Sequence, residues 1–92
     1  MMAKAKRITS DEYFNELDLL SADQAINKAI HTMGNRLNSI SNATDMLAFY
    51  LEGDDRVSSK EQIDRMVEIV MNNTQDMAEI LNALGMYTRT LK

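Results

Sequence analysis

The fold follows from residues 22–52, which read ADQAINKAIHTMGNRLNSISNATDMLAFYLE. Apolar side chains, with one threonine among them, recur there at alternating steps of four and three residues, the repeat of a helix that lays one stripe along another helix. The stripe comprises Ile26, Ile30, Met33, Leu37, Ile40, Thr44, Leu47 and Leu51. No proline interrupts it, so we predict one continuous helix from about Ala22 to Glu52.

A second stripe with the same repeat follows after a short polar connection. It comprises Ile63, Val67, Val70, Thr74, Met77, Leu81, Leu84, Thr88 and Leu91, and Met66, Ile80 and Tyr87 widen it by one residue. We call the two stripes together the apolar seam. Gly53 is expected to end the first long helix, residues 54–57 to connect the two, and Ser58 with Glu61 to cap the second. The chain must reverse at this connection, which predicts an antiparallel helical hairpin.

A shorter helix is predicted over residues 10–20, whose apolar side chains recur at helical spacing: Tyr13, Phe14, Leu17 and Leu20. Thr9 with Glu12, and Ser21 with Gln24, show the pairing of a hydroxyl residue with an acid or amide three positions later that marks helix starts. The pattern leaves open whether this helix runs on into the next. We therefore predict an all-α chain with two parts: 1–20, a basic tail and short helix, and 21–92, the helical hairpin.

Helices of about 31 residues are roughly 46 Å long, and a lone hairpin leaves one side of each broad stripe in water over that length. The stripe width therefore predicts a homodimer in which two hairpins form a four-helix bundle. The alternative is that the first helix folds back and covers part of the stripe. Thr44 and Thr74 are expected to bond a carbonyl one turn back rather than to take part in chemistry.

Composition excludes several classes of function. The 92 residues contain no cysteine and one histidine, which rules out a disulfide framework and a zinc site, and no metal site is predicted. The net charge of −4 argues against nucleic acid as a partner. No apolar run is long enough to cross a bilayer and the first ten residues lack the apolar stretch of a signal peptide, so a cytoplasmic protein is expected.

His31 is the candidate for chemistry because imidazole is the side chain that serves as a neutral nucleophile near pH 7. It follows the seam residue Ile30, so it lies off the seam on a polar stripe with Asn27, Asn35, Asn38 and Asn42. A lone exposed histidine is most often ordinary surface. Gly34, however, costs about 1 kcal/mol in mid-helix relative to alanine, which favours the close approach of a partner at this point.

Residues 31–40, HTMGNRLNSI, resemble the H-box of bacterial sensor histidine kinases, and the resemblance extends to about Tyr87. In that family an acidic residue follows the phospho-accepting histidine, and an Asn or Thr, a proline and a leucine come after it. The matching positions here are His31, Asn35, Leu37 and Ile40. Thr32 stands in the place of the acidic residue, and Arg36 in the place of the proline.

The resemblance implies a dimerisation and histidine-phosphotransfer domain of a two-component phosphorelay, in which His31 exchanges a phosphoryl group with the aspartate of a response-regulator receiver. Asn35 would orient water, and the docking face would comprise Asn27, Lys28, Gly34 and Asn38. Thr32 argues against autokinase activity and leaves open whether the domain transfers the group or acts as a receiver phosphatase. No cofactor is implied in this chain: the receiver would bring Mg²⁺, and ATP would act only through a separate kinase domain.

Three alternatives remain at the level of sequence. His31, Thr32 and Met33 also resemble the start of monomeric histidine phosphotransfer domains, which continue with a lysine and a glycine where this chain has Gly34 and Asn35. The chain is either part of a larger kinase or a stand-alone relay protein. The rival from another class is a non-catalytic helical dimerisation or adaptor module.

Acidic residues of the second long helix are expected to form a solvated face: Glu61, Asp64, Glu68, Asp76 and Glu79.

Overall fold

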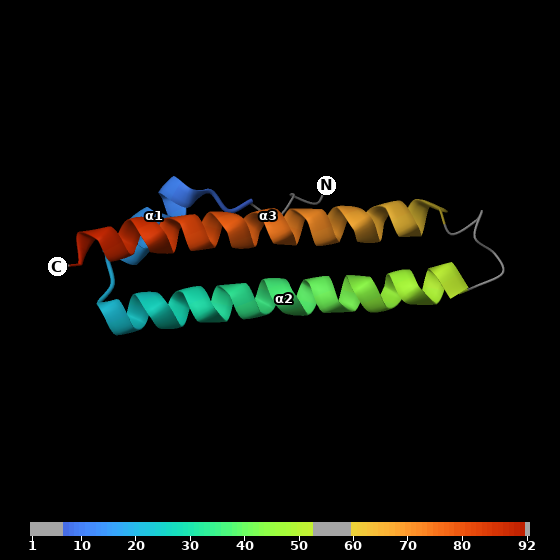
Figure 1. Ribbon diagram of the computed structural model, residues 1–92, viewed down its shortest axis with the longest axis horizontal. Coiled ribbons are helices and arrows are strands. Elements are labelled where there is room, and N and C mark those ends of the chain that lie inside the picture. The colour runs from blue at the N-terminus through green and yellow to red at the C-terminus, as the bar shows by residue number, and fades with distance from the viewer. Residues whose placement is uncertain (1–6, 53–59, 92) are drawn as a thin grey trace, which may run out of the picture.

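The computed structural model describes residues 7–52 and 60–91, and three α-helices make up that part of the chain. α1 spans Ser10–Asp18, α2 spans Ala22–Glu52 and α3 spans Lys60–Thr90. α2 and α3 lie side by side and antiparallel, as Figure 1 shows, in a rod of 57 × 28 × 17 Å. The predicted all-α fold, a short helix followed by an antiparallel hairpin, is confirmed.

The first two helices begin at side-chain caps. Thr9 Oγ1 accepts a hydrogen bond from the Glu12 amide at 3.4 Å. At α2 the cap is reciprocal, because the Gln24 amide donates to Ser21 Oγ at 3.3 Å and the Ser21 amide donates to Gln24 Oε1 at 3.2 Å. These bonds satisfy amides that a helix start otherwise leaves unpaired, so α1 and α2 are two separate helices with a break at residues 19–21.

The connection between the long helices is not described. α2 ends at Glu52 and α3 begins at Lys60. The predicted helix end at Gly53, the connection over residues 54–57 and the cap at Ser58 therefore lie outside the described residues.

The core of the chain lies where α1 packs against the hairpin. α1 contacts mainly α3 and to a smaller extent α2. The buried apolar cluster comprises Tyr13, Leu17, Ala25, Ala29, Ile80, Ala83 and Tyr87. The Tyr87 hydroxyl donates a hydrogen bond to the Leu20 carbonyl at 3.0 Å, which fixes the break between α1 and α2 to the end of α3.

Most of the apolar seam lies outside this core. Ile30 and Leu37 are 61% and 53% exposed, whereas Ala25, Ala29 and Ala43 of α2 are buried. On α3 the buried residues likewise lie one position before the four-and-three repeat: Asp76, Ile80, Ala83 and Tyr87. Two of them, Ile80 and Tyr87, are residues that widen the seam, so this edge of the seam is part of the core. The stripe buried within the chain is therefore the neighbouring one, which on α2 consists of small alanines. The larger seam residues are left for another surface.

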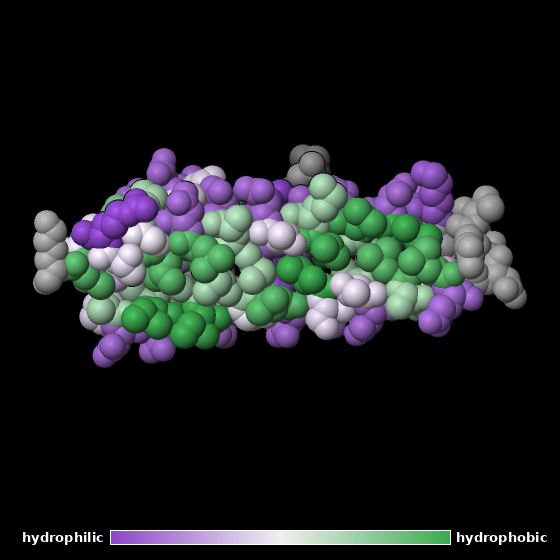
Figure 2. All heavy atoms as spheres, viewed as in Figure 1, coloured by the Kyte–Doolittle hydropathy of each residue, from purple (hydrophilic) through white to green (hydrophobic). Residues whose placement is uncertain are grey.

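Figure 2 shows an apolar band that runs along both long helices. In the same view α1 lies behind α3, so α1 has folded back onto the hairpin but on the side away from this band. Large apolar residues exposed along the seam include Ile26, Ile30, Leu37, Leu51, Val67, Leu81 and Leu91. α1 does cover part of the stripe, because Ile80 and Tyr87 are buried in one cluster with Tyr13 and Leu17. The alternative in which the first helix folds back and covers part of the stripe is therefore confirmed at this end of the hairpin, and the exposed residues above are left uncovered.

The two threonines within the seam bond to their own helices. Thr44 Oγ1 donates to the Ile40 carbonyl, and Thr74 Oγ1 donates to the Val70 carbonyl, both at 2.7 Å. The expectation for both residues is confirmed. With its hydroxyl satisfied inside the helix, each threonine presents mainly a methyl group to whatever covers the seam.

Candidate functional site

His31 lies on the side of α2 that faces away from both the core and the seam. Successive helical residues turn by about 100°, so His31 is about 200° from the buried Ala29 and about 100° from the seam residue Ile30. Its side chain is exposed, and within the described residues it makes no hydrogen bond or ion pair. The imidazole is therefore open to an approaching molecule without any change in the fold.

The polar stripe around His31 is also exposed. Asn27, Asn35 and Asn38 are exposed, which confirms that the stripe faces solvent. Helical side chains lean toward the N-terminus of their helix, so the imidazole of His31 lies over the turn that carries Asn27 and Lys28, and the amide of Asn35 leans toward His31. The predicted site residues thus share one accessible patch of α2, except for Lys28, which is drawn toward α1.

Gly34 leaves room beside His31. A Cβ atom built at Gly34 would meet no other atom within 4 Å. The glycine is therefore not required by packing inside this chain. Its position one turn from His31 is open surface, which agrees with a role in the approach of a partner rather than in folding.

Thr32 has a structural role that follows from its contacts. The Tyr13 hydroxyl donates to Thr32 Oγ1 at 2.9 Å, and Thr32 Oγ1 donates in turn to the Lys28 carbonyl at 2.8 Å. Thr32 therefore ties α1 to α2 one residue from His31 but on a different side of the helix. A hydroxyl engaged in this way differs from the free carboxylate that sensor kinases carry at this position.

Lys28 is held by two side chains of α1. Its Nζ lies 3.6 Å from Glu16 Oε1 and 5.6 Å from the centroid of the Tyr13 ring. Both partners of the ion pair are partly exposed, so the pair is weak and solvent-screened. The sequence placed Lys28 near His31 but gave no indication that α1 would compete for it.

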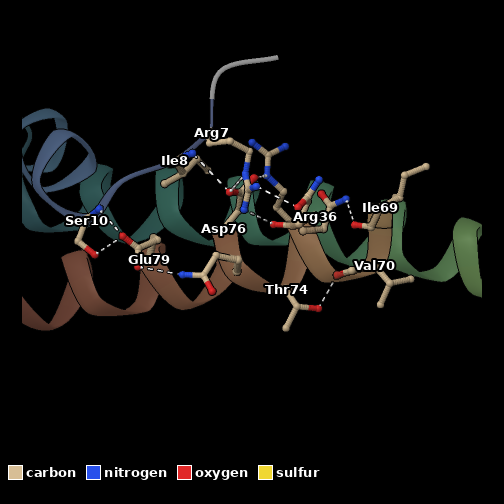
Figure 3. A network of polar contacts seen from close by, with 12 residues as sticks. Arg7, Ile8, Ser10, Arg36, Ile69, Val70, Thr74, Asp76 and Glu79 are labelled. Carbon is tan, nitrogen blue, oxygen red and sulfur yellow. Dashed lines mark hydrogen bonds and ion pairs between the residues drawn. The ribbon is translucent and has the colours of Figure 1, made fainter. Parts of the chain in front are cut away.

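A polar cluster that sequence reasoning missed lies at the middle of the hairpin (Figure 3). Asp76 is 6% exposed, and its Oδ1 accepts a hydrogen bond from Arg7 Nε at 2.9 Å. Its Oδ2 lies 3.3 Å from Arg36 Nε, so one carboxylate joins the N-terminal segment, α2 and α3. Arg7 also donates to the side chain and the carbonyl of Asn72.

A second acid of α3 holds the start of α1. Glu79 Oε1 accepts hydrogen bonds from both the amide and the hydroxyl of Ser10 at 3.0 Å, and Asn82 Nδ2 donates to the same hydroxyl. The interpretation of Asp76 and Glu79 as members of a solvated acidic face is therefore wrong. The spacing of the residues could have indicated that Asp76 is buried. It lies four residues before Ile80 and seven before Ala83, and therefore on the same face of the helix.

Over residues 7–52 and 60–91, no three side chains of His, Cys, Asp or Glu gather in a way that could hold a metal ion. Within the same ranges no helix combines the length and the apolar character needed to cross a bilayer.

Comparison with known proteins identifies no relative of this chain. No protein-family model matches the chain, and no match is found among curated proteins or solved structures. The resemblance of residues 31–40 to the H-box of sensor kinases therefore stays a prediction from the sequence.

Proposed function

We propose that this chain is a dimeric phosphoryl-exchange domain, in which His31 accepts a phosphoryl group from, or donates it to, a receiver aspartate. The observation that carries the proposal is the position of His31: exposed on the first long helix of an antiparallel hairpin and facing away from both the core and the seam. A nucleophile in that position stays accessible when the seam is covered. Asn35 lies on the same accessible patch, whereas Leu37 and Ile40, the other matching positions, lie on the seam.

The transfer step needs little from the chain besides position. A ring nitrogen of neutral imidazole attacks the phosphorus of the receiver's aspartyl phosphate in line, the N–P bond forms, and the bond to the carboxylate oxygen breaks. The imidazole loses a proton from its other ring nitrogen, and the carboxylate leaves as an anion. The receiver supplies the Mg²⁺ that the phosphoryl oxygens require.

The dimer is the part of the proposal that the exposed seam supports. Exposed large apolar residues of α2 and α3 form a band along both helices, and within the described residues α1 covers only a small part of it. A second copy presents the same band over the same length, so two hairpins bury it by forming a four-helix bundle. His31 remains outside that interface, and both copies can dock a receiver.

The test is to incubate the purified chain with a panel of phosphorylated receivers and to look for acid-labile phosphate on the chain. We expect label on wild-type protein and none on His31→Gln, which should keep the same oligomeric state because the residue is off the seam. The matched control is Asn42→Gln, an exposed change on the same stripe that should keep the label. Absence of label on wild-type protein, with no faster loss of phosphate from any receiver, would contradict the proposal.

A second candidate is a helical dimerisation or adaptor module without phosphoryl transfer. The observation that favours it is the residue next to His31, which is Thr32 and not an acid. The hydroxyl of Thr32 is bonded to Tyr13, so this position has a structural role. In this case His31→Gln changes no measurable behaviour, whereas substitutions on the seam abolish partner binding. The same labelling experiment separates the two functions.

A further inference from the structure

The contacts of Lys28 suggest how the charge around His31 is controlled. We propose that Lys28 binds the phosphoryl group carried by His31, and that Glu16 of α1 competes with this group for the lysine. The inference rests on the proposed function, which it deepens by naming a phosphoryl-binding residue and the helix that regulates it. Lys28 therefore has two alternative anionic partners, one on α1 and one on its own helix.

Helix geometry brings Lys28 to the phosphoryl group. Residues three apart are neighbours on a helix surface, with Cβ atoms about 5–6 Å apart. Because the His31 side chain leans toward the N-terminus of α2, a group bonded to its ring lies over the turn that carries Lys28. The four-carbon stem of lysine is long enough to place its ammonium group against phosphoryl oxygens there.

The present partners of Lys28 are weak enough to be displaced. The distance from its Nζ to Glu16 Oε1 is 3.6 Å, and the two side chains are 36% and 59% exposed. The contact with the Tyr13 ring, at 5.6 Å from the centroid, is also loose. A phosphoryl group carries close to two negative charges near neutral pH, against one on Glu16, so it is the stronger partner for the ammonium.

Phosphorylation would also act on α1. α1 contacts α2 less than it contacts α3. The Tyr13 hydroxyl bonds Thr32 and the Lys28 carbonyl, Tyr13 and Leu17 share a buried cluster with alanines of α2, and Lys28 is paired with Glu16. Loss of Lys28 to the phosphoryl group leaves the Glu16 carboxylate facing a new dianion on the same side of α2. The hold of α1 on α2 is thereby weakened, so the state of His31 is transmitted to the N-terminal helix.

The proposal can be tested without a receiver. Phosphoramidate phosphorylates imidazole directly: the ring nitrogen attacks phosphorus, the P–N bond to the leaving ammonia breaks, and the ring proton leaves with it. The second ionisation of the phosphoryl group on His31 is then followed by ³¹P NMR as a function of pH. A bound cation favours the dianion and lowers the pKa of the phosphoryl group.

We expect Lys28→Gln to raise the phosphoryl pKa by about 0.3 to 0.7 unit, the size of an exposed ion pair, and Lys28→Arg to restore most of the shift. Glu16→Gln should lower the pKa, because it releases Lys28. This effect should shrink in the Lys28→Gln background, since the coupling in a double-mutant cycle isolates the action of Glu16 through the lysine. The control is Lys60→Gln, which breaks an exposed pair with Asp64 far from His31 and should shift nothing.

Equal pKa values in wild-type protein and Lys28→Gln would overturn the inference, as would an effect of Glu16→Gln that is the same with and without Lys28. These outcomes differ from failure of the proposed function. If no receiver exchanges phosphate with the chain while the lysine-dependent shift is present, the phosphoryl-binding residue stands and the relay does not.

Discussion

At the scale of single residues, the role of a side chain depends on the residues that it contacts in the folded chain. Gly34 and Gly85 both occupy mid-helix positions where an added Cβ meets nothing within 4 Å. Asp76, by contrast, is buried and holds arginines from two other segments. A small residue beside His31 is thus free of packing constraints, whereas an acidic residue that looks like surface in the sequence is part of the interior.

Substitutions at Gly34 separate folding from docking. Gly34→Ala and Gly34→Leu should each raise the free energy of unfolding by about 0.5–1 kcal/mol, because both side chains extend into open space and favour helix more than glycine does. Urea denaturation checks the stability of both. Phosphoryl exchange should fall several-fold in Gly34→Leu and much less in Gly34→Ala, and equal rates in the two variants would remove Gly34 from the docking face.

Removal of the charge at Asp76 should be costly. Asp76→Asn leaves Arg36 beside a neutral amide in the hairpin interior and weakens the hold on Arg7, and we expect the free energy of unfolding to fall by about 1–3 kcal/mol. Asp64→Asn is the matched control, since Asp64 is paired only with an exposed lysine, and its cost should stay under about 0.5 kcal/mol. Chemical denaturation at one fixed protein concentration measures both, and equal costs would contradict a structural role for Asp76.

At the scale of elements, α1 is held by two different kinds of contact. Its apolar face enters the groove between the long helices through Tyr13 and Leu17, while Ser10 at its start is bonded by Glu79. α1 has only nine residues, too few to be a stable helix alone, so its structure depends on this docking. This dependence is the basis of our proposal that phosphorylation of His31 acts on α1.

The docking of α1 is tested by two leucines that differ in burial. Leu17 is 0% exposed and Leu19 is 87% exposed. Leu17→Ala should cost about 2–4 kcal/mol of the free energy that holds α1 in place, because a buried side chain is removed and a cavity left. Amide hydrogen exchange should show loss of protection in α1 with α2 and α3 retained. Leu19→Ala should leave protection unchanged, and loss of α1 protection in that variant would contradict the observed orientation.

At the scale of the whole molecule, the chain has two apolar surfaces, of which one is buried within the chain. The alanine-lined side of the hairpin is covered by α1, while the seam with its larger residues faces outward along both helices. A band of this length is unusual for a stable monomer and typical of an interface. We propose that a second copy of the chain covers this band in a symmetric homodimer.

The seam predicts how oligomeric state and stability are linked. Leu37→Asn should convert the dimer to monomer and lower the melting temperature, because it places an amide in the bundle core, and the melting temperature of wild-type protein should rise with protein concentration. Light scattering coupled to gel filtration measures the change. Leu37 is more than half exposed in the single chain, so a monomeric protein would tolerate this substitution within about 0.5 kcal/mol. Asn38→Ser, one residue off the seam, is the control and should remain dimeric.

The sequence alone determined the helices and much of the candidate site, because those features depend on neighbours along the chain. Heptad spacing, the absence of proline and the cap at Ser21 located α2, and the offset of His31 from Ile30 placed the histidine on an exposed face. Only the tertiary structure decided which stripe of each helix is buried within the chain. That choice depends on the packing of α1 against Ala25, Ala29 and Ala83, and on Asp76 pairing with two arginines far away in sequence. Local periodicity marks both stripes as apolar or small but contains no information on distant partners, so the capture of Lys28 by Glu16 was decided by packing alone.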